Sequence, residues 1–407
     1  MNCLRCSLAL LGCVFAALAP HAEAAQPAKG APADWIEPTG HRVIRLTGDS
    51  GGSSFYFHQN AYTASGDKMV ISTRGGLAAL DLTTLGKSPP KLEIVVEGRA
   101  GNVVVGKKTR QIFYLRGNSI YATHLDTRAT RKIGELPSEW RNGSGLAVNA
   151  DETLLAGSAH DPKAKAEVAD KGGNVEKPKP PPTAPKGKKG FTAGGRSMVL
   201  YTVEIKSGAV KRFHPATDWL NHVQFSPTDP HLILFCHEGP WHEVDRVWTI
   251  RTDGTGLRKT HSRTMDMEIW GHEFFGADGK TVWFDLQTPR SKVFWLAGVD
   301  VASGKEIRYK VAREHWSVHF NVSPDGKWFA GDGGGPSSVA APGNGQWIYL
   351  FTPKDGVLEA EKLVDLGRHN YKTEPNVTFT PDGRWIVFRS NIHGPTHVYA
   401  VEVRKSK

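Results

Sequence analysis

The feature that most constrains the fold of this chain is a short turn motif that recurs along most of its length. One copy reads Val322-Ser323-Pro324-Asp325-Gly326-Lys327 and precedes the apolar run Trp328-Phe329-Ala330. The clearest copies lie at 225–227, 275–280, 322–327 and 379–384, and weaker copies lie at 62–68, 105–108 and 148–152. An Asp-Gly turn fits the twist of a β-hairpin because glycine accepts positive φ. The motif therefore predicts repeated antiparallel strands.

These repeats predict an all-β fold, a seven-bladed β-propeller of four-stranded antiparallel blades over residues 42–407. The units recur at intervals of roughly 40–50 residues, as propeller blades do. A lone blade cannot bury both of its faces, so the blades must stack around an axis. The 44 glycines and 25 prolines supply the many turns that such a fold needs. Residues 42–47 alternate like a strand without a blade of their own, and we expect this N-terminal strand to close the ring beside residues 397–403.

The first 24 residues read as a secretory signal, and residues 25–41 read as a linker. Arg5 supplies a positive charge, residues 8–18 form a short apolar run, and Ala22-Glu23-Ala24 is a small-x-small cleavage site. The run is too short to span a bilayer, and no later segment could do so. We therefore expect an exported protein, periplasmic or secreted, with cleavage near Ala24.

Cysteine usage argues against a disulfide within the mature chain. Of the 4 cysteines, Cys3, Cys6 and Cys13 lie in the predicted signal and only Cys236 remains. Cys236 ends an apolar run, so we interpret it as a buried small residue in preference to a catalytic thiol.

The formal net charge of +10 is weak evidence for any particular partner. Part of the excess lies in residues 161–195, a Lys/Pro/Gly-rich stretch that reads as a solvated loop insertion. The simplest interpretation is an insertion without a function of its own, and contact with an acidic polymer or a partner site is the alternative. Nucleic-acid binding is not expected, because many basic residues lie in this loop and export removes the usual partners.

The repeat also predicts which residues meet at one mouth of the ring. The position four residues before the Ser/Thr position of each turn should be equivalent in every blade, and it holds Gln59, Asn102, Gly145, His222, His272, His319 and Asn376. Three successive blades contribute histidine. A polar, water-filled channel would explain this pattern, and so would a converging active site. Glu374 lies on the same strand face as Asn376, so imidazoles, a carboxylate and an amide could together bind a divalent cation.

A second polar group follows the strand at 232–235. Residues 237–248 are unusually rich in polar side chains, and the guanidinium of Arg246 could bind a carboxylate bidentately. A surface ion pair of Arg246 with Glu243 or Asp245 is the alternative. His237 and Glu238 could instead hold the residues that contact the substrate in position.

Several of these segments resemble the oligogalacturonate lyase family of polysaccharide lyases, which are seven-bladed propellers. The matching stretches are Tyr56-Phe57-His58-Gln59, His237-Glu238-Gly239-Pro240, Gly271-His272-Glu273-Phe274-Phe275, and residues 222–227, 244–248, 317–323 and 331–333. The Pro-Asp-Gly turns are shared with TolB-like propellers and are less specific. The resemblance implies β-elimination on short uronic-acid oligosaccharides, with His272 as the catalytic base and Arg246 as the assisting arginine. It also implies a substrate-binding surface, for which the candidates are His58, Gln59, His222, His237 and Tyr371.

The resemblance implies a metal cofactor as well, with His319 as one ligand. The other ligands in that family are typically a Gln and two His, where this chain has Tyr371, Glu374 and Asn376. Glu374 and Asn376 can ligate a divalent cation through oxygen, so Mn²⁺ is the expected ion and Ca²⁺ the alternative. A changed ligand set could also mean a changed substrate.

The sequence thus favours an exported lyase that acts on an acidic oligosaccharide, with no nucleic acid and no membrane span involved. A non-catalytic TolB-like periplasmic propeller that binds a glycan or a protein remains an alternative. A metal-dependent hydrolase, or a lyase for a different acidic sugar, is a third.

Overall fold

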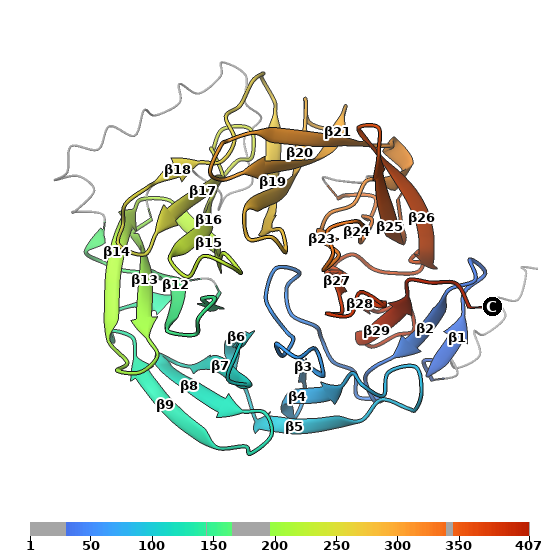
Figure 1. Cartoon of the computed structure of the whole chain (residues 1–407), viewed down its shortest axis with the longest axis horizontal. Coiled ribbons are helices and arrows are strands. Elements are labelled where there is room, and N and C mark those ends of the chain that lie inside the picture. Colours follow the sequence, from blue (N-terminus) through green and yellow to red (C-terminus); the bar gives the residue numbers. More distant parts are fainter. Residues whose placement is uncertain (1–29, 144, 165–195, 339–344, 407) are drawn as a thin grey trace, which may run out of the picture.

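The computed structural model describes residues 30–143, 145–164, 196–338 and 345–406, and it is built almost entirely from β-strands. The sheets are arranged around a central axis as in a propeller, with strands such as β6, β15, β19, β23 and β27 nearest the middle (Figure 1). The predicted signal and most of the predicted loop at 161–195 lie outside the described residues. Helix η1 (Arg313–His315) is a short 3₁₀ turn, and within the described residues no helix has the length and apolar character needed to cross a membrane.

Most sheets are antiparallel meanders whose strands follow one another along the chain. The sheets from the first part of the chain comprise β3 (Lys68–Thr73), β4 (Gly76–Asp81) and β5 (Leu92–Glu97); β6 (Gly101–Val105), β7 (Gln111–Arg116), β8 (Ser119–His124) and β9 (Thr130–Glu135); and β10 (Arg141–Asn142), β11 (Ala147–Val148), β12 (Leu154–His160), β13 (Met198–Glu204) and β14 (Val210–Ala216).

The later sheets follow the same plan. They comprise β15 (Trp219–Phe225), β16 (Leu232–Glu238), β17 (Val247–Arg251) and β18 (Arg258–Lys259); β19 (Ile269–Phe275), β20 (Thr281–Gln287), β21 (Phe294–Asp300) and β22 (Glu306–Val311); and β23 (Phe320–Val322), β24 (Phe329–Gly331), β25 (Trp347–Lys354) and β26 (Val357–Asp365). The last two units form one eight-stranded sheet, but only the parallel pair Lys310–Val357 joins them.

The two ends of the described chain meet in one sheet. It contains β27 (Thr378–Phe379), β28 (Trp385–Ser390) and β29 (His397–Glu402), followed by β2 (Arg42–Arg45) and β1 (Asp34–Ile36). Val43 lies opposite Val401 in the antiparallel pair β2–β29. Strand β1 falls inside the segment that we predicted as a linker, and it forms because it pairs with β2 and because Trp35 packs edge-on against Tyr399.

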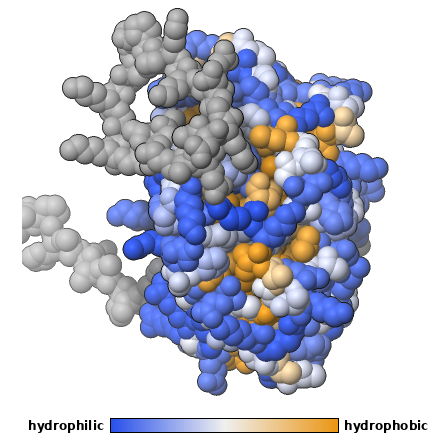
Figure 2. All heavy atoms as spheres, turned by 90° about the vertical axis from the view of Figure 1, so that its left-hand side faces the viewer, coloured by the Kyte–Doolittle hydropathy of each residue, from blue (hydrophilic) through white to orange (hydrophobic). Residues whose placement is uncertain are grey.

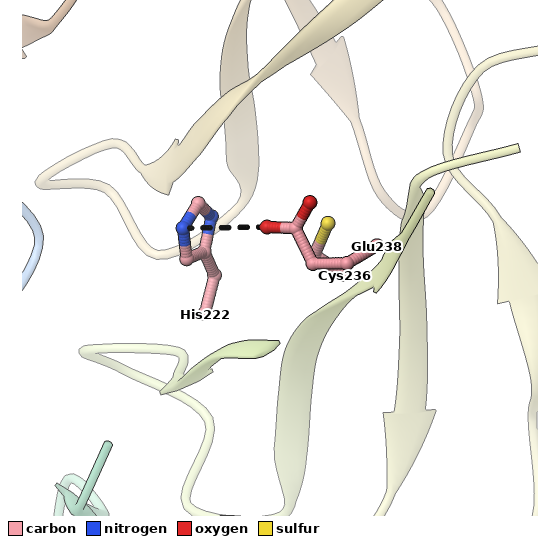
Figure 3. A group of neighbouring side chains, drawn as sticks. All are labelled: His222, Cys236 and Glu238. Carbon is pink, nitrogen blue, oxygen red and sulfur yellow. Dashed lines mark ion pairs between the residues drawn. The ribbon is translucent and has the colours of Figure 1, made fainter. Parts of the chain in front are cut away.

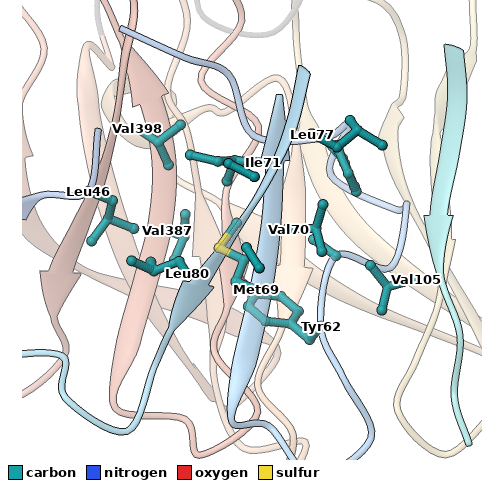
Figure 4. Packing of buried hydrophobic residues seen from close by; sticks show 14 of the residues in the cluster. Leu46, Tyr62, Met69, Val70, Ile71, Leu77, Leu80, Val105, Val387 and Val398 are labelled. Carbon is teal, nitrogen blue, oxygen red and sulfur yellow. The ribbon is translucent and has the colours of Figure 1, made fainter. Parts of the chain in front are cut away.

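Neighbouring sheets pack face to face, and this packing forms the core. Met69 and Val70 alternate on β3, so one side chain faces the sheet that carries Val387 while the other faces Val105 of the next sheet (Figure 4). Both residues are fully buried, and Ile71, the next residue of β3, is as well. The side of the molecule that Figure 2 shows is mostly hydrophilic, with apolar side chains in separate groups.

Five of the seven equivalent positions at the mouth share an unusual backbone conformation, and Gln59 and His319 do not. The ring residues with positive φ are Asn102 (50°), Gly145 (61°), His222 (49°), His272 (48°) and Asn376 (54°). The strand register also shifts at three of these places, between Gly101 and Val104, Asn221 and Gln224, and Gly271 and Phe274. Such bulges redirect a side chain out of the strand alternation. Here they turn polar side chains toward one end of the central channel.

Candidate active site

The histidines predicted to converge do share one environment at the mouth of the channel. The rings of His272 and His319 lie 4.7 Å apart, measured between centroids. Tyr56 lies between His319 and His222, at 5.3 Å and 5.4 Å from their rings, and His58 lies 5.2 Å from His222. Imidazoles that are about 50 residues apart in sequence thus form one continuous cluster.

Each of the three ring histidines is oriented by its own buried carboxylate. The Nδ1 atom pairs with Glu273 Oε1 at 2.8 Å in His222, with Asp285 Oδ1 at 3.1 Å in His272, and with Asp332 Oδ2 at 2.7 Å in His319. A carboxylate that accepts from Nδ1–H fixes the tautomer in which Nε2 carries the lone pair. This arrangement suits both a general base and a metal ligand.

Burial and charge act in opposite directions on the groups of this cluster. Burial disfavours the imidazolium of His272, but Asp285 outweighs it and raises the pKa of His272 above its ordinary value. Burial also disfavours the carboxylate of Glu273, but His222 and Arg246 lower its pKa to about 2. Burial lowers the pKa of His58 to about 3, with His222 adding to the effect, so His58 is neutral at physiological pH.

Arg246 lies beside His272 and is almost completely buried, with 1% of its surface exposed. Its NH1 group donates to Glu238 Oε2 at 2.7 Å, and its guanidinium carbon lies 4.3 Å from the ring centroid of Trp241. The same Trp241 ring lies 5.1 Å from His272. The surface ion pair considered from sequence is not what forms, because Asp245 accepts from Lys259 instead.

The surroundings of His319 offer donor atoms to a divalent cation. His319 Nε2 lies 3.9 Å from Glu374 Oε2, and the side chain of Glu374 is 46% exposed. The Tyr56 hydroxyl also lies 3.3 Å from Nε2, a long hydrogen bond that a cation would replace. One nitrogen and one carboxylate suit a cation that fills its remaining positions with water or substrate oxygens. The residues present therefore fit a divalent cation that takes only a few of its ligands from the protein.

Two other predicted ligands lie nearby but are engaged elsewhere. The amide oxygen of Asn376 accepts the backbone N–H of Phe57 at 3.1 Å. The hydroxyl of Tyr371 donates to the backbone carbonyl of Asp332 at 3.2 Å. Tyr371 thereby holds the segment of Asp332, the carboxylate partner of His319, whereas Asn376 holds the segment that carries Phe57.

The remaining predicted residues divide between the mouth and other places. Gln59 accepts the N–H of Tyr56 and, with His58, lines a central cavity of about 140 Å³. His237 is not in the cluster, because it alternates with Cys236 and Glu238 on β16 and faces the opposite side. There its Nδ1 pairs with Asp218 at 3.2 Å.

Sequence reasoning missed several residues that organise the site. Asp285 and Glu273 were given no role, although each is a carboxylate in an otherwise apolar strand, which is a recognisable signal of a buried functional acid. Tyr56 and Trp241 were quoted only as parts of motifs. The sequence carries no separate signal for these two aromatic residues, because an aromatic side chain is equally expected in the hydrophobic core.

Comparison with known proteins is consistent with this geometry. The family model described as oligogalacturonate lyase matches residues 35–407. This chain belongs to the oligogalacturonate lyase family. As a member of that family it is a carbon–oxygen lyase.

Curated relatives and solved structures agree with the assignment. The oligogalacturonide lyase of Pectobacterium atrosepticum is 24% identical over 397 residues, and the oligogalacturonate lyase of Dickeya dadantii is 25% identical over 397 residues. Each alignment covers 90% of this chain and 95% of the relative. Among solved structures, an oligogalacturonate lyase in complex with manganese has a TM-score of 0.74 at 24% identity, covering 91% of this chain and 96% of that one. The oligogalacturonate lyase of Vibrio parahaemolyticus has a TM-score of 0.72 at 21% identity, with the same coverage.

The close approach of Trp241 to the backbone of this lyase yields a first prediction. A Cβ at Gly271 would lie 2.8 Å from the Trp241 ring and 3.2 Å from Arg246 Nε. We expect Gly271→Ala to lose about 1–3 kcal/mol in the free energy of unfolding and to lower lyase activity, because Arg246 must shift.

The matched control is Gly101→Ala, measured by denaturant unfolding alongside the first variant. Gly101 stands at the equivalent bulge of β6, but a Cβ there meets nothing within 4 Å. Its unfolding free energy should change by about 0.5 kcal/mol or less. Equal losses in the two variants would contradict the proposed packing.

Proposed function

We propose that this chain is an exported lyase that cleaves short oligogalacturonide-type uronic-acid oligosaccharides by β-elimination. The observation that carries the proposal is the cluster of His272, His319 and Arg246 at one mouth, with both imidazoles oriented by carboxylates. Membership of the oligogalacturonate lyase family supports it. We propose further that the ring has seven blades and is closed by β2, and that residues 1–24 are removed on export.

In the proposed reaction His272 is the base. Its Nε2 takes the proton from C5 of the uronate, and the electron pair of the C5–H bond delocalises onto the substrate carboxylate as an enolate-like charge. That pair then forms the C4=C5 double bond as the bond from C4 to the glycosidic oxygen breaks, and the leaving oxygen takes a proton from water. Asp285 stabilises the imidazolium that results. The charge of Arg246 favours the neutral imidazole beforehand, which is the form that can accept a proton.

The negative charge that develops beside the substrate carboxylate needs a positive partner. The guanidinium of Arg246 is held in place by Glu238 and Trp241, so it requires little reorganisation during the reaction. We propose that His319 and Glu374 hold a divalent cation, Mn²⁺ or Ca²⁺, at the same mouth of the channel. The chemistry that such an ion supplies is electrostatic stabilisation of the enolate-like charge. The manganese complex of a solved relative supports this assignment.

The test is a panel of uronide oligomers incubated with purified protein, with and without Mn²⁺ or Ca²⁺. We expect an unsaturated product that absorbs ultraviolet light from oligogalacturonides. If only a different uronide gave such a product, the proposed reaction would stand and the proposed sugar substrate would be wrong. Saturated products, or no product from any uronide, would overturn the proposal.

The pairing of His272 with Asp285 predicts a specific pH dependence. The carboxylate raises the pKa of His272, and only the neutral base can accept a proton. Activity should therefore be lost as the pH falls through that raised pKa. In Asp285→Asn the pKa should fall, so the acid limb of the kcat/KM profile should move to lower pH. Its plateau should drop about 10- to 100-fold, since the partner that orients the imidazole is lost.

The measurement is the pH profile of both proteins under the same ionic conditions. An acid limb that stays in place, or moves to higher pH, would contradict the role of this pair. Asp67→Asn is a suitable comparison, because Asp67 is a carboxylate of the Arg110 ion pair and is not part of the histidine cluster. The acid limb of the kcat/KM profile of Asp67→Asn should lie at the same pH as that of the parent protein.

A further inference from the structure

We propose that His222, Cys236 and Glu238 form a second metal site, which binds a thiophilic divalent ion such as Zn²⁺ and is separate from the cation position at His319. One donor atom from each of the three residues lies within 4.8 Å of the other two. The three side chains point toward one another from two adjacent strands (Figure 3). This proposal does not rest on the identity of the sugar substrate.

The fold builds the group from two features of β15 and β16. Cys236 and Glu238 are two residues apart on β16, so their side chains lie on the same face. His222 lies on β15 within the register shift between Asn221 and Gln224, and its φ of 49° breaks the strand alternation. The bulge turns the imidazole toward the Cys236–Glu238 face.

The donor atoms are oriented as metal ligands usually are. Glu273 accepts from Nδ1 of His222 at 2.8 Å, which leaves the lone pair on Nε2. That atom lies 4.0 Å from Glu238 Oε1. Arg246 and Asn221 hold the two oxygens of Glu238 at 2.7 Å and 3.1 Å, so this carboxylate is positioned before a metal arrives. A tetrahedral zinc ion places its ligand atoms about 3.5 Å apart, so small side-chain shifts would complete the site.

The charge of the group also favours a divalent ion. Glu238 and Glu273 carry two negative charges, and Arg246 carries one positive charge, so the group is one unit negative when the thiol is protonated. A divalent ion that displaces the thiol proton brings the total to zero. Glu273 Oε2 is buried, accepts no hydrogen bond from a nitrogen or oxygen donor among the described residues, and lies beside the Cys236 thiol. The net negative charge of the whole group is what a bound cation would neutralise.

The combination of ligands identifies the class of metal. Thiolate and imidazole together select Zn²⁺ and related ions, whereas carboxylate oxygens alone suit Mg²⁺ or Ca²⁺. The cation position at His319 and Glu374 has no sulfur ligand. A spectroscopic signal from a metal–sulfur bond therefore distinguishes the two sites.

The experiment is a titration of the purified protein with Co²⁺, followed by absorption spectroscopy and competition with Zn²⁺. We expect a thiolate-to-cobalt charge-transfer band that saturates at one equivalent and disappears when Zn²⁺ is added. Cys236→Ser should lose the band and bind Zn²⁺ at least about 10- to 100-fold more weakly. Glu374→Gln should keep the band, because Glu374 belongs to the other position.

Two results would overturn the proposal. One is the absence of a charge-transfer band in the parent protein, a measurement that needs no variant and so does not depend on whether one folds. The other is a band that persists in Cys236→Ser. Failure of the lyase assay would leave the expected cobalt spectrum unchanged, so the two proposals fail independently.

Discussion

Replacing His272 with asparagine should lower kcat by about 10²- to 10⁴-fold, the usual contribution of a positioned general base. Asparagine is the suitable replacement because it stands at the equivalent positions 102 and 376, with φ values of 50° and 54°. The variant should therefore keep the bulge of β19. Its amide can also donate to Asp285, so the buried carboxylate is not left without a partner. The loss of rate would then report the loss of the base.

His222→Asn is the matched comparison for this variant. His222 has the same bulge position, a φ of 49° and its own carboxylate partner. If His222 contributes to binding and His272 to proton transfer, the His222 variant should mainly raise KM, while the His272 variant should mainly lower kcat. Initial rates of ultraviolet-absorbing product, measured across substrate concentrations, separate these effects. A His272 variant that retains kcat within a few-fold of the parent would exclude this residue as the base.

The turn motifs predicted the sheets because each Asp-Gly turn joins two antiparallel strands. The packing of neighbouring blades requires these same strands, so local and long-range interactions agree. The motif at 322–327 does end β23 and precede β24, and the motif at 379–384 lies between β27 and β28. The three-residue strand β1 was missed because it has no turn motif of its own. It depends on pairing with β2, which is a tertiary contact that no local pattern reports.

The convergence of His222, His272 and His319 could be predicted because each has the same offset from its turn. The bulges at His222 and His272 were not predicted, although Asn and Gly at positions 102, 145 and 376 tolerate positive φ better than most residues and could have indicated them. His237 lies outside the cluster for a physical reason. A histidine at the end of a strand can face either side, and only the alternation seen in β16 shows that Glu238 faces the cluster and His237 does not.

Arg246→Met should lower both the stability and the activity of the protein. It leaves the buried carboxylate of Glu238 without its cation, and breaking such a pair costs about 3–5 kcal/mol of unfolding free energy. Burial opposes ionisation of Glu238, but Arg246 holds its pKa below the usual value. Loss of the guanidinium would also remove charge stabilisation from the transition state, which costs kcat/KM about 10²- to 10³-fold. Denaturant unfolding and steady-state rates measure the two losses.

The two roles of Arg246 separate in the double variant Arg246→Met/Glu238→Gln. Removing both charges leaves no uncompensated carboxylate at this pair, so the double variant should regain much of the stability lost by the single one. It should not regain activity, because the positive charge beside His272 is still missing. Recovery of both stability and rate would mean that Arg246 only maintains the fold. If stability recovers and the rate does not, the rate loss comes from the missing guanidinium itself. Destabilisation could not then explain the low rate, because the double variant would be stable.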